Sequence, residues 1–377
     1  MKFDQNIKTG ILGGGQLGLY LLQKAMDWGV TPSIMDSSAE APCRPFAEKT
    51  VLADFRDYNS VYQFGSELDA IAIEIDSVNA GALITLAKNG VRTYPTGDAL
   101  QIIQDKGLQK SFFKEHEIPT GPFELLQSTR EIKTYPGVLK SRKFGYDGHG
   151  VRMIFSVEDT AKIFEGPYLY EEKIEIEKEI SVIVGKDDFG NIVVYPPSEM
   201  IFHTKKNLLD MLVFPAQIPP AVAARAQKIA KKVMNDLQTP GLLAVEFFML
   251  KDGDLLVNEV SPRPHNSGHQ TIEACDLSQY EILMRILYGL PIYQPMTQTN
   301  AVLINLLGEP GQAGPVEYLG MNEISRLPGC SIHLYGKKET RPLRKMGHIT
   351  LTGDNLDELI KNARTIQDSF KVVAAEK

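Results

Sequence analysis

The sequence predicts a multidomain protein of mixed class, α/β at its N-terminus and α+β beyond it. Three observations support this fold class. Apolar strands alternate with amphipathic helices in the first third of the chain, short strands dominate residues 137–195, and a long helix precedes two neighbouring strands after residue 220. The length of 377 residues allows two or three domains at roughly 150 residues each.

The first third of the chain alternates strands and helices. Residues 8–12 form an apolar strand that runs into three glycines, and the next residues carry Leu17, Tyr20 and Leu21 near helical spacing. Such alternation implies a parallel sheet, because each helix returns the chain to the same end of the sheet. The expected elements are strands at 8–12, 30–35 and 70–76 and helices at 16–28 and 78–89.

The pattern changes after residue 95. Residues 98–116 predict two helical pieces interrupted near Gly107, and Pro119, Gly121 and Pro122 then break the chain. The further expected elements are strands at 138–140, 168–170, 180–184, 192–195, 242–250 and 254–260, helices at 221–237 and 271–290, and a β-rich tail from residue 300.

The composition excludes several classes of protein. Hydrophobic residues make up 43% of the chain and charged residues 23%, which excludes wholesale disorder. The net charge of −7 disfavours binding of nucleic acid or anionic membranes by the whole surface. The sequence has neither a secretory signal nor an apolar run near the ~18 residues of a membrane span. We therefore expect a cytoplasmic protein with neither nucleic-acid nor membrane partners.

Its three cysteines, Cys43, Cys275 and Cys330, are too widely spaced to predict a disulfide framework or a zinc site.

A glycine-rich motif stands between the first strand and the first helix. Residues 13–18 match the G-x-G-x-x-G pattern, and Asp36 follows at the end of the next strand, as in a dinucleotide site. Glycines let the backbone approach an anion, and a helix N-terminus supplies N–H donors, so any phosphate would be served equally well. The motif by itself leaves open a nicotinamide cofactor, another phosphate ligand and a tight turn.

Two glutamates, Glu246 and Glu259, lie in the neighbouring strands that follow the long helix. If these strands form a hairpin, both carboxylates can point to one face, where their burial is costly unless a cation or hydrogen bonds offset it. Mg²⁺ reaches proteins through one or two carboxylates plus nucleotide phosphates. The pair therefore predicts a magnesium site, the alternative being two solvated glutamates on an edge strand.

Lys140 and the glycine-rich residues 145–150 predict a cover for phosphates. A strand lysine neutralises charge, and the amides of such a loop donate hydrogen bonds to phosphate. No G-K-[ST] sequence closes the loop, so it is not a Walker A motif, and a hairpin with a flexible tip is the plainer alternative. The strand at 169–174, with Glu179 beyond it, can offer backbone groups to an adenine and a carboxylate to a ribose.

Two further segments concentrate polar side chains. Residues 258–269 directly follow the second glutamate strand, and two prolines stiffen a loop that presents Arg263 and His265. Polar residues on a stiff loop beside a metal favour anion recognition and catalysis over a purely structural loop. Residues 337–348 form a basic island in an acidic chain, which suits a substrate phosphate but also fits a solvated hairpin.

Taken together, these segments resemble the ATP-grasp superfamily and, within it, the N5-carboxyaminoimidazole ribonucleotide synthetases of purine biosynthesis. The resemblance is most specific at 258–274, 145–150, 13–18 and 341–348. It implies an ATP-grasp fold in three parts: an N-terminal parallel α/β domain, a β-rich lid and a C-terminal domain. We expect domains at 1–96 (substrate side), 97–195 (helical linker and lid), 196–300 (catalytic) and 301–377 (C-terminal, β-rich).

The resemblance implies an ATP-dependent C–N ligase. ATP, bicarbonate and 5-aminoimidazole ribonucleotide would give N5-carboxyaminoimidazole ribonucleotide, ADP and phosphate by way of carboxyphosphate. The expected cofactors are then ATP and Mg²⁺, the partners are the small-molecule substrates, and the family's tendency to dimerise predicts a homodimer. In this family the front glycine loop serves the ribonucleotide rather than a nicotinamide cofactor.

The resemblance also implies roles for particular residues. The metal ligands would be Glu246 and Glu259, and the catalytic residues Arg263, His265 and Lys338. ATP would be held by Lys106, Lys140, Gly145, Tyr146, Asp147, Gly148, His149, Gly150, Val151, Glu171, Glu172, Lys173, Ile174, Glu179, Phe202, Asn258 and Glu259. The substrate would contact Gly15, Gln16, Leu17, Glu74, Tyr146, Asp147, Asn266, Ser267, Arg341, Arg344 and Lys345.

Three positions depart from the family pattern. Phe202 stands where a histidine is common, Asp76 shortens a carboxylate, and Phe144 replaces a glycine before the lid loop. The alternatives that stay open are another ATP-grasp carboxylate–amine ligase that uses an acyl phosphate, an NAD-dependent oxidoreductase and a nucleotide sensor without catalysis. The oxidoreductase hypothesis assigns no function to the two glutamates. The sensor hypothesis does not explain an arginine and a histidine beside a metal site.

Overall fold

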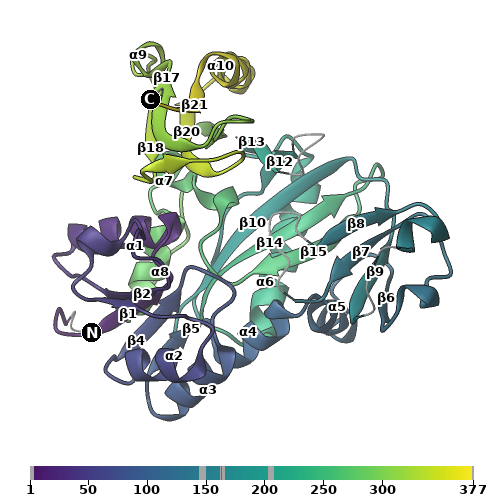
Figure 1. The fold of residues 1–377 in the computed structure, drawn as a ribbon, viewed down its shortest axis with the longest axis horizontal. Helices are drawn as coiled ribbons and strands as arrows, with labels where there is room; N and C mark the ends of the chain where they lie inside the picture. The colour runs from purple at the N-terminus through teal and green to yellow at the C-terminus, as the bar shows by residue number, and fades with distance from the viewer. Residues whose placement is uncertain (1–3, 144–149, 162, 164–165, 203–207, 376–377) are drawn as a thin grey trace.

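The computed structural model describes residues 4–143, 150–161, 163, 166–202 and 208–375. Within these ranges the strands form four sheets (Figure 1): a five-stranded parallel sheet near the N-terminus and antiparallel sheets of four, nine and three strands. The described helices include none that is both long and apolar enough to cross a membrane. All three cysteines are free.

The N-terminal unit is the parallel α/β structure that the alternation of strands and helices predicted. Its sheet has the order β3-β2-β1-β4-β5, and every neighbouring pair is parallel. Helix α1 packs on one face and α2 and α3 on the other, so the central strands β1 and β4 are buried on both faces. The elements are β1 (Thr9–Leu12), α1 (Gln16–Asp27), β2 (Ser33–Asp36), a 3₁₀ turn (Arg44–Phe46), β3 (Thr50–Leu52), α2 (Tyr58–Gly65), β4 (Ala70–Ile73), α3 (Ala80–Lys88) and β5 (Arg92–Tyr94).

Two helices lead from this unit to the four-stranded sheet. The helix break expected near Gly107 falls at Asp105, whose carboxylate starts α5 by accepting from the amides of Gly107 (2.9 Å) and Leu108 (3.1 Å). The four-stranded sheet, in the order β6-β9-β7-β8, lies at the right of Figure 1. The elements are α4 (Gly97–Gln104), α5 (Lys106–Glu115), β6 (Phe123–Leu126), β7 (Gly137–Ser141), β8 (Val151–Ile154) and β9 (Tyr168–Glu172), with 3₁₀ turns at Thr129–Glu131 and Val157–Thr160.

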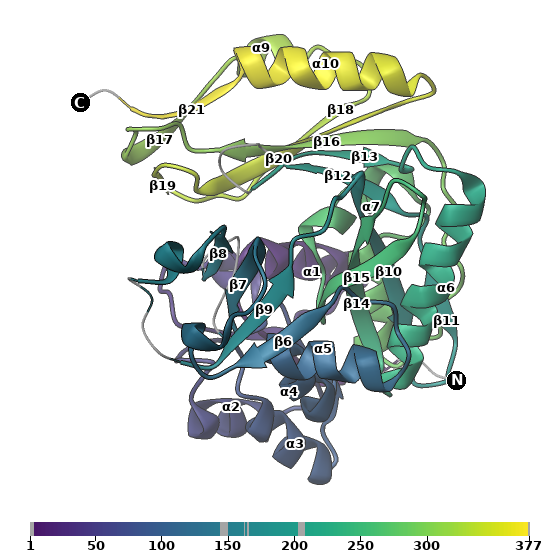
Figure 2. The same cartoon turned by 90° about the vertical axis from the view of Figure 1, so that its right-hand side faces the viewer.

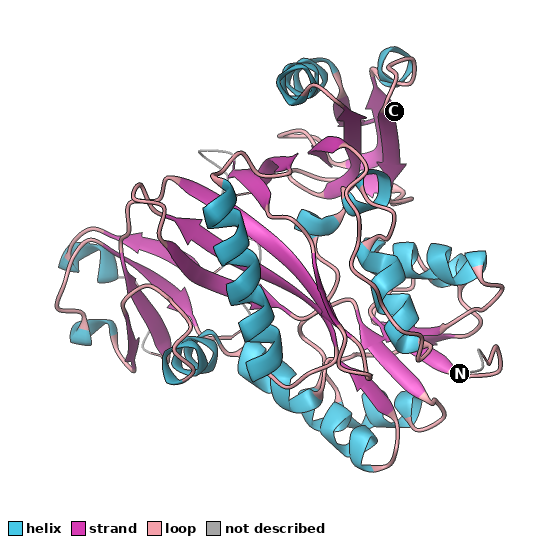
Figure 3. Cartoon of the chain, turned by 180° about the vertical axis from the view of Figure 1, so that it is seen from behind, coloured by secondary structure: helices cyan, strands magenta, loops and turns pink. Residues whose placement is uncertain are grey.

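The nine-stranded sheet forms the centre of the molecule. Its order is β15-β14-β10-β12-β13-β16-β20-β18, with β11 paired to β10. Helix α6 lies along the back of this sheet (Figure 3), where Ile180, Val182, Val245 and Phe247 pack against it. The elements are β10 (Lys178–Lys186), β11 (Ile192–Val194), β12 (Ser198–Phe202), β13 (Leu209–Phe214), α6 (Pro220–Asp236), β14 (Gly241–Met249), β15 (Leu255–Ser261), β16 (Asn300–Leu307), β18 (Cys330–Leu334) and β20 (Lys345–Gly353).

Two features of this region differ from the expected division of the chain. The boundaries expected at 195/196 and 300/301 fall inside the nine-stranded sheet, and the domain division stays a prediction. The single helix expected at 271–290 is two helices, α7 (Thr271–Ala274) and α8 (Gln279–Leu287). The break arises because the Ser278 hydroxyl accepts from the amide of Glu281 (3.2 Å) and so begins a new helix.

The C-terminal residues add a helix that the sequence analysis missed. Helix α10 (Leu356–Ser369) lies across β16 and β20 (Figure 2), with Leu359, Ala363 and Ile366 buried against the sheet. These residues recur at helical spacing after the capping residue Asn355, a sequence signal for a helix that the expectation of a β-rich tail did not use. The remaining elements are α9 (Met321–Ile324) and the three-stranded sheet of β17 (Gly314–Leu319), β19 (Glu339–Thr340) and β21 (Lys371–Ala374).

Candidate active site

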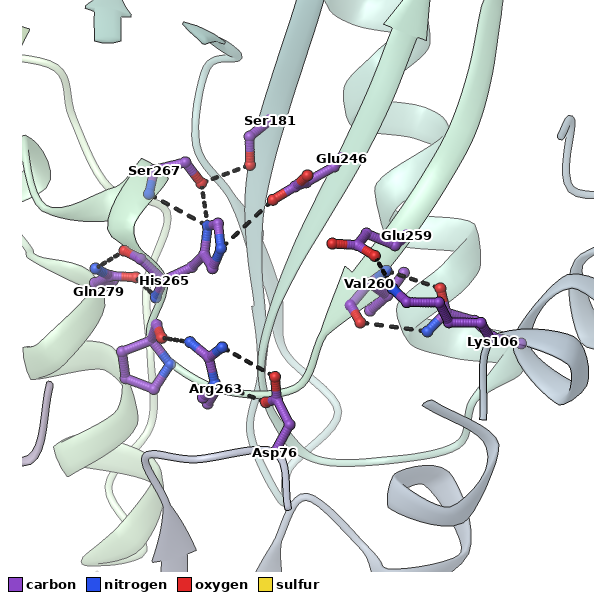
Figure 4. Close-up of polar contacts among 12 residues, drawn as sticks. Asp76, Lys106, Ser181, Glu246, Glu259, Val260, Arg263, His265, Ser267 and Gln279 are labelled. Carbon is purple, nitrogen blue, oxygen red and sulfur yellow. Dashed lines mark hydrogen bonds and ion pairs between the residues drawn. The ribbon is translucent and has the colours of Figure 1, made fainter. Parts of the chain in front are cut away.

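The hairpin of β14 and β15 brings the two glutamates together. Glu246 and Glu259 stand opposite each other in the ladder, so both side chains leave the same face of the sheet (Figure 4). Ser181 of β10 is the neighbour of Glu246 on its other side, and Glu179 lies two residues before Ser181 on the same face. Desolvation raises the pKa of Glu179 to about 7. Three carboxylates therefore share the face of the sheet that lies opposite α6.

Lys106 balances part of this negative charge. Its ammonium, at the start of α5, pairs with Glu259, and the attraction lowers the pKa of that carboxyl. The pKa of Glu246 is raised, mainly by desolvation and to a smaller extent by repulsion from Glu259. Two crowded carboxylates fit the protein share of a Mg²⁺ site, to which phosphates add the remaining ligands. Within the described ranges no group of three or more His, Cys, Asp and Glu side chains is placed to hold a metal ion.

A second charged cluster lies between the four-stranded sheet and α5. The buried Glu171 of β9 pairs with Lys140 of β7 and, at 2.8 Å, with Lys110 of α5. Lys140 also donates to the side-chain oxygen of Asn258 (3.2 Å), which connects the cluster to β15. Lys110 donates to the carbonyl of Val257 (3.1 Å), and desolvation lowers the pKa of Lys110 to about 8. Two lysines against one glutamate leave a positive charge that suits a phosphate.

The loop after β15 places an arginine and a histidine beside the carboxylates. The Arg263 guanidinium donates to both oxygens of Asp76 (2.6 and 2.9 Å), which follows β4 in the N-terminal unit. The His265 ring has its Nε2 3.4 Å from Glu246 Oε1 and its Nδ1 2.8 Å from the Ser267 hydroxyl (Figure 4). The loop is therefore tied to the N-terminal unit on one side and faces the glutamates on the other.

The front glycine loop is occupied by the protein's own carboxylates. The amides of Gly15 and Gly18 donate to Glu74 (2.9 and 3.3 Å), and the amide of Gly14 donates to Asp36 (2.6 Å). Burial raises the pKa of Glu74 to about 7. A dinucleotide pyrophosphate would need these same donors, so the loop is not the open anion site that its sequence pattern suggested. This arrangement contradicts the oxidoreductase interpretation of residues 13–18.

The basic segment contains two neighbouring lysines, Lys337 and Lys338, that differ in exposure. The side chain of Lys338 is 83% exposed and lies 3.5 Å from the Glu40 carboxylate. Lys337 is half-buried and donates to the carbonyl of Lys345 (2.7 Å). Desolvation lowers the pKa of Lys337 to about 8, while attraction to Glu74 opposes that shift. Lys337 is therefore the less exposed of the two neighbouring lysines, of which the sequence analysis named Lys338.

The other residues expected at the site differ in their placement. Both polar atoms of the Asn266 side chain are buried and have no hydrogen-bond partner in the described part of the chain, which suits a ligand contact. Leu17 and Ser267 are buried, and Phe202 packs against the core. Exposed or half-buried are Gln16, Gly150, Val151, Glu172, Lys173, Ile174, Arg341, Arg344 and Lys345. Outside the described residues lie Gly145, Tyr146, Asp147, Gly148 and His149.

The sequence analysis missed two residues that contact the predicted site. Lys110 follows Lys106 by four residues, so both face the same side of α5, and this spacing was an available signal. Ser181 had a weaker signal, a single small polar residue among the buried apolar residues of β10.

Comparison with known proteins matches the chain in three successive parts. Residues 6–104 match the ribonucleotide synthetase preATP-grasp domain, residues 111–280 the ATP-grasp domain, and residues 301–362 the phosphoribosylaminoimidazole carboxylase C-terminal domain. The chain is 34% identical to the N5-carboxyaminoimidazole ribonucleotide synthase of Brucella melitensis, over 90% of this chain and 95% of that protein. It is also 34% identical to a phosphoribosylaminoimidazole carboxylase of Candida glabrata, over 95% of this chain but 65% of that longer protein.

Solved structures agree with these matches. The crystal structure of N5-carboxyaminoimidazole ribonucleotide synthetase from Thermotoga maritima has a TM-score of 0.91 and 35% identity, covering 98% of this chain and 100% of that one. The Aspergillus clavatus synthase in complex with ADP and 5-aminoimidazole ribonucleotide has a TM-score of 0.86 and 27% identity, covering 97% and 99%. Fold and site together define an ATP-grasp ligase. The chain belongs to the N5-carboxyaminoimidazole ribonucleotide synthase family.

Proposed function

We propose that this protein carboxylates 5-aminoimidazole ribonucleotide with bicarbonate at the expense of ATP, giving N5-carboxyaminoimidazole ribonucleotide, ADP and phosphate. The observation that carries the proposal is the convergence of Glu246, Glu259, Arg263 and His265 on one face of the nine-stranded sheet. The 34% identity to the Brucella melitensis synthase over 90% of the chain supports the choice of substrate.

The nucleotide would lie between the four-stranded sheet and the β14–β15 hairpin. Lys140 of β7 and Lys106 of α5 would both reach its phosphates, and each is paired with a carboxylate that a phosphate could replace. Glu246 and Glu259 would hold Mg²⁺, which neutralises phosphate charge when it is bound. Glu171 and Glu179 would bind the rest of the nucleotide, together with Tyr146, Asp147 and the other residues expected there.

The chemistry needs two successive displacements. A bicarbonate oxygen attacks the γ-phosphorus of ATP, and the bond to the bridging oxygen breaks to release ADP. The amine of the ribonucleotide then attacks the carbon of carboxyphosphate, phosphate leaves with the electrons of the carbon–oxygen bond, and the amine loses a proton. Arg263, held in place by Asp76, would orient the bicarbonate, and His265 would donate a hydrogen bond to an oxygen that gains charge.

The ribonucleotide would lie where the N-terminal unit meets the C-terminal residues. Glu74 and Asn266, whose side chain has no hydrogen-bond partner among the described residues, would contact the aminoimidazole and the ribose. The basic segment would hold the phosphate, and we place the half-buried Lys337 there, with Arg344 and Lys345, in preference to the exposed Lys338. A homodimer and a cytoplasmic location are part of the same proposal, and sedimentation of the purified protein would test the dimer.

Phosphate release from Mg-ATP tests this function directly. We expect release by the purified protein to require both bicarbonate and the ribonucleotide, and labelled bicarbonate carbon to appear in the product. Release that ignores both compounds would refute the proposal. Release that requires a different carboxylate and amine would favour another ATP-grasp ligase that works through an acyl phosphate.

A further inference from the structure

A short chain of buried hydroxyl groups runs from β10 to the His265 ring. The hydroxyls of Ser181 and Ser267 lie 2.7 Å apart, and the Ser267 hydroxyl lies 2.8 Å from His265 Nδ1 (Figure 4). Ser181 is 1% exposed and Ser267 0%, so water does not compete for these contacts. The Ser267 hydroxyl therefore connects Ser181, which stands opposite Glu246 in the ladder of β10 and β14, to the Nδ1 side of the ring.

The geometry determines which nitrogen of His265 carries the proton. The backbone amide of Ser267 also points at Nδ1, at 3.3 Å. A backbone N–H can only donate, so Nδ1 has to be the unprotonated nitrogen that accepts. The hydrogen of the neutral ring is then on Nε2, which lies 3.4 Å from Glu246 Oε1.

The same constraint sets the direction of the serine contacts. The Ser267 hydroxyl has one hydrogen, and next to an accepting Nδ1 that hydrogen has to point to the ring. Toward Ser181 the Ser267 oxygen can then only accept, so Ser181 donates. Each hydroxyl polarises the next, which strengthens the hydrogen bond that reaches the ring.

The backbone of His265 is fixed as well. The buried side chain of Gln279, at the start of α8, accepts from the His265 amide (2.9 Å) and donates to the His265 carbonyl (2.8 Å). Ring rotation is then the main freedom that the residue retains, and the two serines remove it.

We propose that Ser181 is a positioning residue, acting through Ser267 to hold His265 as the Nε2–H tautomer with that N–H directed at the glutamate pair. For its catalytic consequence this inference rests on the proposed function. A hydrogen on Nε2 makes His265 a donor to a bicarbonate or phosphate oxygen beside the carboxylates, and not a base at that nitrogen.

The tautomer is tested on the full-length, substrate-free protein. Nitrogen-15 NMR of protein labelled at its histidines separates protonated from unprotonated ring nitrogens, and the signals lost in His265→Asn assign this residue. We expect His265 to show an unprotonated Nδ1 and a protonated Nε2 near neutral pH. A protonated Nδ1 would overturn the proposal. Because no substrate is present, this result does not depend on whether the protein carboxylates the ribonucleotide.

Kinetics of serine variants test the role of Ser181. Loss of one hydrogen bond in the relay should lower kcat of Ser181→Ala about tenfold, with the KM for ATP within about twofold of wild type. Because Ser181 acts through Ser267, the double variant Ser181→Ala/Ser267→Ala should be no slower than Ser267→Ala alone. Ser181→Thr, which keeps the hydroxyl, should restore most of kcat.

Ser198 provides the matched control. It pairs with Ser181 in the neighbouring strand β12 and is also buried, but its hydroxyl accepts from Gln270 rather than facing His265. Ser198→Ala should therefore leave kcat within about twofold of wild type, although it too removes a buried hydroxyl. Equal losses of kcat in Ser181→Ala and Ser198→Ala, or additive losses in the double serine variant, would overturn the proposed relay.

Discussion

Glu259→Gln tests the central electrostatic argument, because it keeps the shape of the side chain and removes its charge. Glu259 supplies one of the two carboxylates proposed to hold Mg²⁺, and its low pKa beside Lys106 means that it is ionised near neutral pH. Removal of one preorganised electrostatic contact commonly costs about 10²–10³ in rate, or about 2.7–4 kcal/mol of transition-state stabilisation. We expect a loss of kcat/KM in this range.

The assay is phosphate release as a function of Mg²⁺ concentration, with circular dichroism to verify the fold. Half-saturation with Mg²⁺ should rise at least about tenfold in Glu259→Gln, since one of the two carboxylates is lost. Glu199→Gln is the matched control, because Glu199 lies on β12 of the same sheet, opposite Ile180 on the α6 face, and pairs with Lys178 at 2.8 Å. Near-normal turnover of Glu259→Gln, or an equal loss in Glu199→Gln, would refute the reasoning.

Three further predictions concern other residues. Burial raises the pKa of Glu74 from 4.5 to about 7 in the folded protein. Because the carboxyl of the unfolded chain ionises first as the pH rises through this window, the free energy of unfolding falls by up to about 3 kcal/mol. Thermal melts between pH 5 and 8 should show a smaller decline for Glu74→Gln than for wild type. Lys110→Met should lower the free energy of unfolding by about 2 kcal/mol and raise the KM for ATP. The reason is that Glu171 loses one charged hydrogen bond but keeps its ion pair with Lys140. An unchanged urea midpoint of unfolding would contradict this prediction. Lys337→Met should raise the KM for the ribonucleotide about tenfold or more, whereas Lys338→Met should not. The opposite result would favour Lys338 over Lys337.

The strongest sequence patterns predicted the elements that build the site. Strand–helix alternation predicted the parallel N-terminal sheet, and two apolar strands around a turn signal predicted the hairpin that pairs Glu246 with Glu259. Both succeed because the patterns are local and the constraint is strong: a strand of period two has to place alternate residues on one face. Short elements such as β3, α2 and β5 were missed, since three to eight residues carry little periodic signal.

Long-range contacts were beyond the reach of sequence patterns. Nothing near Arg263 in the sequence indicates Asp76, which is 187 residues away, as its partner. The choice between Lys337 and Lys338 depends on the local path of the chain after β18, which a run of basic residues does not encode. The glycine motif by itself left its ligand open for a related reason, because Glu74, which accepts from the amide of Gly15, follows another strand.

The bidentate contact between Arg263 and Asp76 limits how modular this enzyme can be. The ATP-grasp match covers residues 111–280, whereas Asp76 belongs to the part matched as the preceding domain. A central segment moved into another protein would contain Arg263 but not Asp76. A chimaera therefore has to take both units from the same protein to keep this contact. Swapping the N-terminal unit to alter substrate choice would then also disturb the group proposed to orient the bicarbonate.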